Sequence, residues 1–133
     1  MAEGKVLTGA GLRGQVAGKT ALSTVGKSGA GLTYRGYDVQ DLAENCQFEE
    51  VAYLIFFGEL PTAAQLTAYK AKLKSLRQLP QALKEVLERI PADSHPMDVM
   101  RTGVSMLGNL ETEQSFAEQR AVADRFLATL PAI

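Results

Sequence analysis

Histidine, cysteine and tryptophan are scarce in this sequence. Its 133 residues contain one histidine, one cysteine and no tryptophan. A lone histidine, His95, excludes metal sites that need two histidines at helical spacing, and a lone cysteine, Cys46, excludes an internal disulfide. The single thiol fits a reducing cytosol. Because no histidine lies near Cys46 in the sequence, we do not expect this cysteine to act as a nucleophile.

Long hydrophobic runs and an excess of one charge are also missing. The longest apolar run covers residues 51–57, far short of the roughly 20 residues that span a bilayer, and no signal peptide opens the chain. With a net charge of -1, the chain has no bulk field that attracts nucleic acid or anionic lipid. We therefore expect a cytoplasmic, globular protein without membrane or nucleic-acid partners.

Two glycine-rich stretches near the start resemble nucleotide-binding motifs. Residues 9–14 match G-x-G-x-x-G, but residues 1–8 make a poor strand and no acidic residue is suitably placed downstream. Gly26, Lys27 and Ser28 resemble the end of a phosphate-binding loop, yet Gly29 and Gly31 make a poor helix start. We predict a loosely ordered arm over residues 1–19 and a short β-hairpin with strands at 20–25 and 32–35, with phosphate binding as the alternative.

Apolar residues recur at helical spacing from Asp38 onward, so residues 20–133 are predicted to be mainly helical. Asp38, Thr62 and Ser94 are expected to cap helices, Gly58 to close one, and Pro91 to end another. The predicted helices cover residues 39–44, 47–57, a stretch begun by Thr62, 80–91, 94–108, and a stretch from about 115 to 131.

Two of these helices carry unusual sequences. The helix over 47–57 is apolar on every side, which indicates burial on all faces and needs more neighbours than one small bundle supplies. The helix over 94–108 contains Gly103, which makes helix formation less favourable by roughly 1 kcal/mol than alanine would. A glycine at this position indicates close approach by a neighbouring element.

Few polar residues stand out as candidates for chemistry. His95 begins a helix, where the dipole disfavours a charged ring, so we predict a neutral imidazole bonded to the backbone. Asp98 and Arg101 are three residues apart and are expected to pair or to position a neighbouring helix. Arg35 lies between two tyrosines and is expected to stack between them or to pair with a carboxylate, with an anionic ligand as the alternative.

Three ordered stretches carry a family resemblance. They are TALSTVGKS and LTYRGYD (20–28 and 32–38), FEEVAYLIFFGELPT (48–62) and SHPMDVMRTGVS (94–105). In order and spacing the sequence resembles the citrate synthase family, and it looks most like the 2-methylcitrate synthase branch. The resemblance runs from about residue 17 to residue 108. It implies a mainly α fold, with a multi-helical segment of the large domain and a short N-terminal β-hairpin.

The resemblance also implies an activity. Enzymes of this branch condense propionyl-CoA with oxaloacetate to 2-methylcitrate and CoA, whereas citrate synthases use acetyl-CoA, which is the alternative here. The acyl-CoA is a substrate, so no cofactor or metal is expected. A homodimer with its active site between a large and a small domain is implied. Lys72 matches a substrate-contacting position of the family.

The same resemblance implies that the catalytic residues lie outside this chain. The family's chemistry uses an aspartate and two histidines in downstream motifs, and none of these motifs occurs here. We therefore predict that these residues are the N-terminal portion of the enzyme, inactive alone, with an exposed apolar patch that other parts would cover. The alternative from another class is a non-catalytic helical interaction module.

Overall fold

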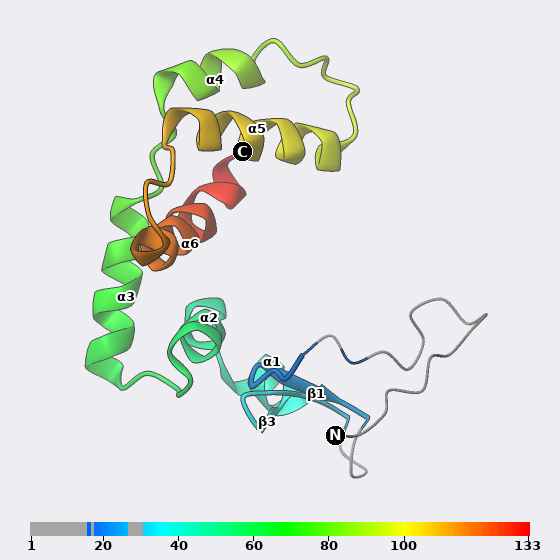
Figure 1. Ribbon diagram of the computed structural model, residues 1–133, viewed down its shortest axis with the longest axis vertical. Coiled ribbons are helices and arrows are strands. Elements are labelled where there is room, and N and C mark those ends of the chain that lie inside the picture. Colours follow the sequence, from blue (N-terminus) through cyan, green and yellow to red (C-terminus); the bar gives the residue numbers. More distant parts are fainter. Residues whose placement is uncertain (1–15, 17, 27–30) are drawn as a thin grey trace, which may run out of the picture.

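A computed structural model describes residues 16, 18–26 and 31–133. Most of the expected arm over residues 1–19, the glycine motif at 9–14, and Lys27 and Ser28 lie outside the described residues. A small sheet and the first helix lie at one end, two later helices lie at the opposite end, and the last helix turns back toward the middle (Figure 1). The mainly helical fold expected from the sequence is confirmed.

The sheet is antiparallel and has three strands in the order β1-β2-β3. Strands β1 (Ser23–Val25) and β2 (Leu32–Tyr34) form the predicted hairpin, and β3 (Tyr37–Asp38) is a further strand that the sequence did not indicate. A two-residue turn joins β2 to β3, with positive φ at Arg35 (51°) and Gly36 (92°). Turns of this handedness match the twist of the paired strands.

The next two helices begin and end where the sequence predicted. The side chain of Asp38 accepts a hydrogen bond of 2.7 Å from the backbone of Gln40 and caps α1 (Val39–Asn45). Helix α2 (Phe48–Phe57) begins with a capping box between Gln47 and Glu50. It ends at Gly58, whose φ of 93° is the left-handed conformation that glycine adopts without strain.

Helices α3 and α4 agree with the sequence at their starts but not at both ends. Thr62 caps α3 (Ala63–Ser75) in the predicted box with Gln65. Pro80 is the N-cap of α4 (Gln81–Leu87), which ends four residues before Pro91. The prediction that this helix continues to Pro91 is wrong. The backbone N–H groups of Arg89 and Ile90 donate to carbonyls three residues back instead of four, so the chain tightens into a turn after Leu87.

Helix α5 (Pro96–Leu110) is capped by His95, so the prediction of Ser94 as its cap is wrong. Pro96 occupies the first helical position, which makes the residue before it the cap. The helix also continues past Gly108 to Leu110. A 3-10 turn, η1 (Phe116–Glu118), leads into α6 (Gln119–Thr129), and η2 (Leu130–Ala132) follows.

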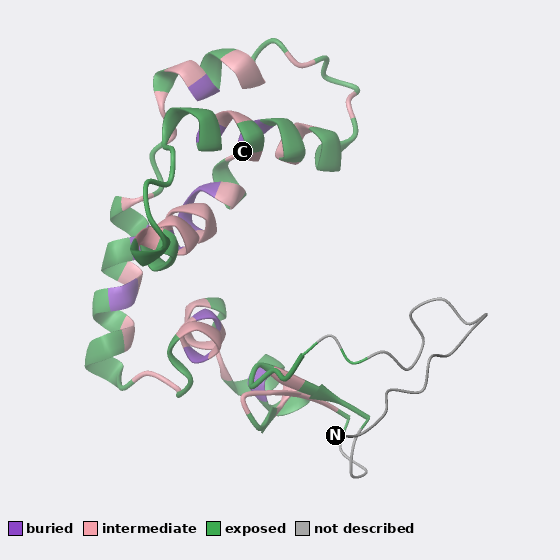
Figure 2. Ribbon diagram, in the orientation of Figure 1, coloured by how far each residue is buried: buried purple, intermediate pink, exposed green. Residues whose placement is uncertain are grey.

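The main core lies where α2, α3 and α6 meet. It consists of Ala52, Tyr69, Leu73 and Ala128, with Tyr53, Leu76 and Leu127 packed against it. Helix α2 is covered there on one side only, because Phe48 and Phe57 remain 67% and 47% exposed. Figure 2 shows that buried residues are few and scattered along the helices. An exposed apolar surface on α2 is what the sequence predicted for this chain alone.

Gly103 of α5 lies against the side chain of Ile133. A Cβ built on Gly103 would be 2.4 Å from Cγ2 of Ile133, closer than carbon atoms approach without displacement. The close approach that this glycine indicated is therefore confirmed, and it joins α5 to the segment that follows α6.

Two glycines of the same helix provide a matched comparison. Substituting Gly103→Ala is expected to lower the free energy of unfolding by about 1–3 kcal/mol, because the methyl group collides with Ile133. Gly108→Ala has no atom within 4 Å of its new Cβ and should raise the free energy of unfolding by up to about 1 kcal/mol. Urea unfolding of both variants checks this, and equal effects of the two substitutions would contradict it.

Candidate functional site

The predicted site residue Lys72 lies on α3 and forms an ion pair with α6. Its Nζ is 2.5 Å from Oδ2 of Asp124. The Asp124 side chain is fully buried, whereas that of Lys72 is 50% exposed. A buried carboxylate without a partner is strongly disfavoured, so the ammonium group of Lys72 stabilises the charge of Asp124 at this crossing.

Tyr69 completes the network from the preceding turn of α3. Its hydroxyl donates a hydrogen bond of 2.9 Å to Oδ1 of Asp124. Tyr69 and Lys72 are three residues apart, which places both side chains on the face that meets α6. Burial raises the pKa of Tyr69, and the hydrogen bond to Asp124 raises it further, so the phenol keeps its proton at neutral pH.

This network is suited to holding two helices together. Each carboxylate oxygen of Asp124 accepts one hydrogen bond from α3, and the Tyr69 ring packs in the main core. Neither group is placed as an acid or base next to a nucleophile, since the described residues bring no histidine or thiol to it. Substrate contact by Lys72 remains a prediction. Its ammonium group donates one hydrogen bond to Asp124, so two of its three hydrogens could bind a further partner.

The backbone hydrogen bond predicted for His95 is present. Its Nδ1 accepts a hydrogen bond of 3.2 Å from the backbone N–H of Met97. The ring is exposed, and no other side chain of the described residues is bonded to it. Asp98 and Arg101 pair at 3.1 Å on the exposed face of α5, as predicted. His95 is therefore a capping residue.

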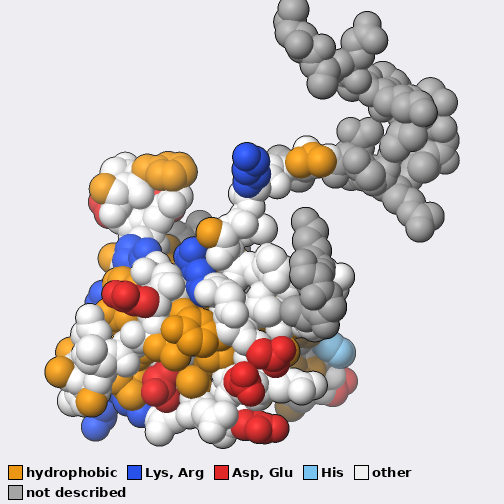
Figure 3. Space-filling model, turned by 90° about the horizontal axis from the view of Figure 1, so that it is seen from below, with side chains coloured by type: hydrophobic (Ala, Val, Ile, Leu, Met, Phe, Trp, Pro, Cys, Tyr) orange, Lys and Arg blue, Asp and Glu red, His pale blue; other side chains and the backbone are white. Residues whose placement is uncertain are grey.

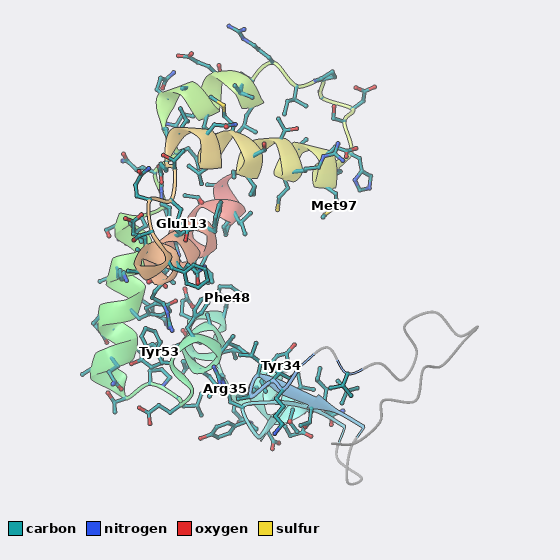
Figure 4. The ribbon with its side chains drawn as sticks, in the orientation of Figure 1. Tyr34, Arg35, Phe48, Tyr53, Met97 and Glu113 are labelled. Atoms are coloured by element: carbon teal, nitrogen blue, oxygen red, sulfur yellow. The ribbon has the colours of Figure 1, made fainter. Side chains whose placement is uncertain are left out.

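Arg35 binds backbone carbonyls, so the prediction that it stacks between tyrosines or pairs with a carboxylate is wrong. Its Nη2 and Nε donate to the carbonyl of Ile55 at 2.8 and 3.3 Å, and its Nη1 lies 3.5 Å from the carbonyl of Ala21. The carbonyls in the last turn of a helix lack helical partners and carry partial negative charge, which a guanidinium satisfies. The side chain thus ties the sheet to the end of α2 (Figure 4).

A second ion pair on α6 was not indicated by the sequence. Arg125 donates to both carboxylate oxygens of Glu111, at 2.9 and 2.7 Å. Its Nη1 also donates to the backbone carbonyls of Leu76 and Gln78, beyond the end of α3. The hydrogen bonds from Arg125 lower the pKa of Glu111 below its usual value. No local signal in the sequence indicated this cluster, because α6 contains two other charged residues besides Arg125.

An open groove of about 480 Å³ lies beside this second pair. Its lining is mostly apolar and includes Leu107 of α5 and Phe126 of α6, while Glu111 and Arg125 contribute to its wall. Lys72 and His95 are not among the lining residues. The structure therefore does not bring the two sequence candidates together around this groove.

The described residues form neither a metal centre nor a thiol site. Among residues 18–26 and 31–133, no three histidine, cysteine or acidic side chains come together to hold a metal ion. Burial and the nearby Glu50 raise the pKa of Cys46, which keeps it a thiol and agrees with its expected lack of reactivity. None of the helices in the described part is long and apolar enough to cross a bilayer.

Comparisons with known proteins give one consistent family. The model of the family described as citrate synthase, C-terminal domain, matches residues 11–133. A 2-methylcitrate synthase of Shewanella oneidensis is 77% identical over 133 residues, which are 100% of this chain and 36% of that protein. A citrate synthase of Mycolicibacterium smegmatis is 44% identical over 126 residues, or 92% of this chain and 33% of that protein.

The fold comparison agrees with these matches. A citrate synthase from Thermoplasma acidophilum, solved as a ternary complex with carboxymethyl coenzyme A and oxaloacetate, superposes with a TM-score of 0.79 at 27% identity. The superposition covers 89% of this chain and 32% of that structure. This chain thus spans about a third of the length of the proteins it matches.

The ion pair between α3 and α6 gives the first test of this region. Lys72→Met should lower the free energy of unfolding by about 3 kcal/mol, because it leaves the buried carboxylate of Asp124 without its cation. This value is the low end of the range for breaking a buried pair, since Lys72 is half exposed. Lys74→Met, on the same helix but exposed, should change it by less than about 0.5 kcal/mol. Chemical denaturation at pH 7 measures both, and equal stability of the two variants would rule out a stabilising role for the pair.

The pair between Glu111 and Arg125 predicts a dependence on pH. Because its pKa is lowered in the folded state, Glu111 contributes stability above its usual pKa of 4.5 and loses it as the pH falls through the lowered value. Glu111→Gln should therefore cost about 1 kcal/mol at pH 7 and progressively less below pH 4.5.

Glu113→Gln, in the same loop, is the matched control and should follow the wild-type profile. Thermal unfolding between pH 7 and pH 3 provides the measurement. A deficit for Glu111→Gln that stays constant with pH would show that the ionised carboxylate is not what matters.

Proposed function

This chain belongs to the citrate synthase family, and we propose that it forms part of a 2-methylcitrate synthase. The proposed enzyme joins the carbon next to the thioester of propionyl-CoA to the ketone carbon of oxaloacetate, and hydrolysis of the thioester then releases CoA. The observation that carries this proposal is the 77% identity to the Shewanella oneidensis enzyme along all 133 residues.

The residues described here supply scaffold to the proposed enzyme. His95 caps a helix, Cys46 is a half-buried thiol, and the buried Asp124 is paired with Lys72. None of them has the free acid, base or nucleophile that a condensation needs. We propose that this chain is the N-terminal portion of the protein, that it is inactive alone, and that the catalytic residues lie in the portion absent from it.

The substrates, assembly and location belong to the same proposal. The Thermoplasma acidophilum relative was solved with oxaloacetate and a coenzyme A derivative, which supports oxaloacetate and an acyl-CoA as substrates here. We propose that the reaction needs no further cofactor. The half-exposed ammonium of Lys72 is available to a substrate carboxylate or phosphate. We further propose a cytoplasmic homodimer that acts in propionate catabolism.

Citrate synthase activity with acetyl-CoA is the second candidate. The 44% identity to the Mycolicibacterium smegmatis citrate synthase favours it, since that sequence covers nearly the same residues. The two thioesters differ by one methylene group, which is worth only about 1–3 kcal/mol of discrimination in an apolar pocket. The choice between them therefore depends on pocket residues of the whole protein.

Steady-state rates with both thioesters test the proposed activity. The whole natural protein, expected at about 40 kDa because this 14.3 kDa chain is 36% of its relative, should release CoA in the presence of oxaloacetate. Its kcat/KM should be about 10-fold or more higher with propionyl-CoA than with acetyl-CoA. The reverse preference would favour citrate synthase, and a natural protein of 14.3 kDa without activity would favour a non-catalytic module.

A further inference from the structure

Helix α5 meets the last residue, Ile133, at Gly103. This glycine is buried, and the side chain of Ile133 lies where a Cβ of Gly103 would stand. Helix axes approach most closely where no side chain separates them, because the side chains at a contact set the distance between the axes. Gly103 and Ile133 therefore mark the crossing point between α5 and the segment formed by α6 and η2.

On one side of this crossing point, the contact extends for about two turns of helix. Arg125 stands eight residues before Ile133, and it donates to Glu111, which stands eight residues after Gly103. Leu107, halfway between Gly103 and Glu111, is buried. The two segments thus run antiparallel, and one residue back along α5 corresponds to about one residue forward along α6 and η2.

On the other side of the crossing point, the same face of α5 is largely open. This face carries four residues that are spaced four, three and four positions apart: Pro96, Met100, Gly103 and Leu107. Pro96 is exposed and Met100 is only half-buried. Met97, at the edge of the face, is 65% exposed and lies on the side of α5 away from α4 (Figure 4). The segment of α6 and η2 therefore covers the C-terminal half of this face and leaves the N-terminal half accessible.

The open half of the face carries no charge. Successive residues of a helix are turned by about 100°, so Asp98 and Arg101 project from the opposite side of α5. These two side chains pair with each other at 3.1 Å. A charged partner would lose hydration on the open half without finding a counterion, and an apolar partner would not. The surface is therefore suited to an apolar segment.

The backbone keeps helical hydrogen bonding up to Ile133. Although η2 is a 3-10 turn, the N–H of Ile133 also donates to the carbonyl of Thr129, four residues back, at 3.2 Å, as in an α-helix. Figure 1 shows the end of the chain beneath α5, on the side opposite α4. A segment that continued in this direction would pass along the open half of the face, because α5 runs antiparallel to it.

We propose that the segment following Ile133 in the whole polypeptide is an apolar helix that packs on the N-terminal half of α5, over Pro96 and Met100. The proposal rests on the proposed function, in which this chain is the N-terminal portion of a protein nearly three times as long. A helix contact extends to both sides of its crossing point, so the missing half should involve about eight residues, 134–141. The side chains that face α5 should be apolar and recur at helical spacing.

Other occupants and other surfaces fit less well. Hydrophobic side chains are also exposed elsewhere, as the patch seen from below shows (Figure 3). Helix α5 differs because a neighbour already in contact with it ends at the edge of the open surface. A second copy of the chain would have to enter beside Ile133, where the polypeptide itself continues in the proposed enzyme. The adjoining segment is therefore the better occupant.

Photo-methionine, a diazirine analogue of methionine, tests this packing in the whole natural protein without a mutation. It replaces the methionines of the chain, which include Met97, Met100 and Met106 of α5, and light links each of them to atoms in contact with it. Peptide mass spectrometry of the monomer band from a denaturing gel locates the links within one polypeptide. Met100 is expected to link to residues 134–141.

Two matched variants assign these links. Met100→Leu removes the reactive group with little change in volume, and it should lower the yield of links to residues 134–141 by roughly tenfold or more. Met106→Leu is the control. Met106 lines a groove together with Val86 of α4, so its replacement should leave that yield unchanged.

Links from Met100 only in the band of doubled mass would assign the face to a second copy and overturn the proposal. The absence of links between Met100 and residues 134–141 would overturn it as well. Because the readout does not depend on catalysis, the same protein is also assayed for release of CoA. Active protein without these links would refute the packing and leave the proposed function standing, whereas inactive protein with them would do the reverse.

Discussion

The buried carboxylate of Asp124 is the constraint on which the arrangement of the helices depends. It has no access to water, so its charge must be met from within the protein, and α3 provides both partners from one face. The contacts of Asp124 with Lys72 and Tyr69 fix the point where α3 crosses α6, whereas apolar contacts alone would let the two helices shift along each other. The neighbouring Arg125 adds a second fixed point, because its guanidinium reaches Glu111 after α5 and the carbonyls that follow α3. Two adjacent residues of α6 thus orient three helices.

Local signals predicted much of the fold. Asp38, Thr62 and Gly58 set helix ends through contacts within four residues, so their sequence patterns sufficed. Gly103 indicated a close neighbour without revealing that the neighbour is Ile133. The short strand at Tyr37 was missed because two residues give no detectable alternation.

The candidate site was harder to predict, because its contacts join distant residues. Tyr69 meets Asp124 across 55 positions, and Arg125 meets Leu76 across 49. No periodicity within one helix contains that information. A charged residue at a buried position of α6 was the available hint, since such a residue needs a partner. Which residue serves as that partner depends on how the helices cross, and the packing of the whole chain determines this crossing.

The turn at Arg35 shows two demands on one position. Its φ of 51° suits glycine or asparagine, yet the guanidinium anchors the sheet to the last turn of α2 through the carbonyl of Ile55. Glycine at this position would remove the backbone strain but also the hydrogen bonds to Ile55, whereas arginine keeps both. Few residue types can therefore satisfy the turn and the contact with α2 together. Because these hydrogen bonds join them, the hairpin and α2 should become ordered or disordered together.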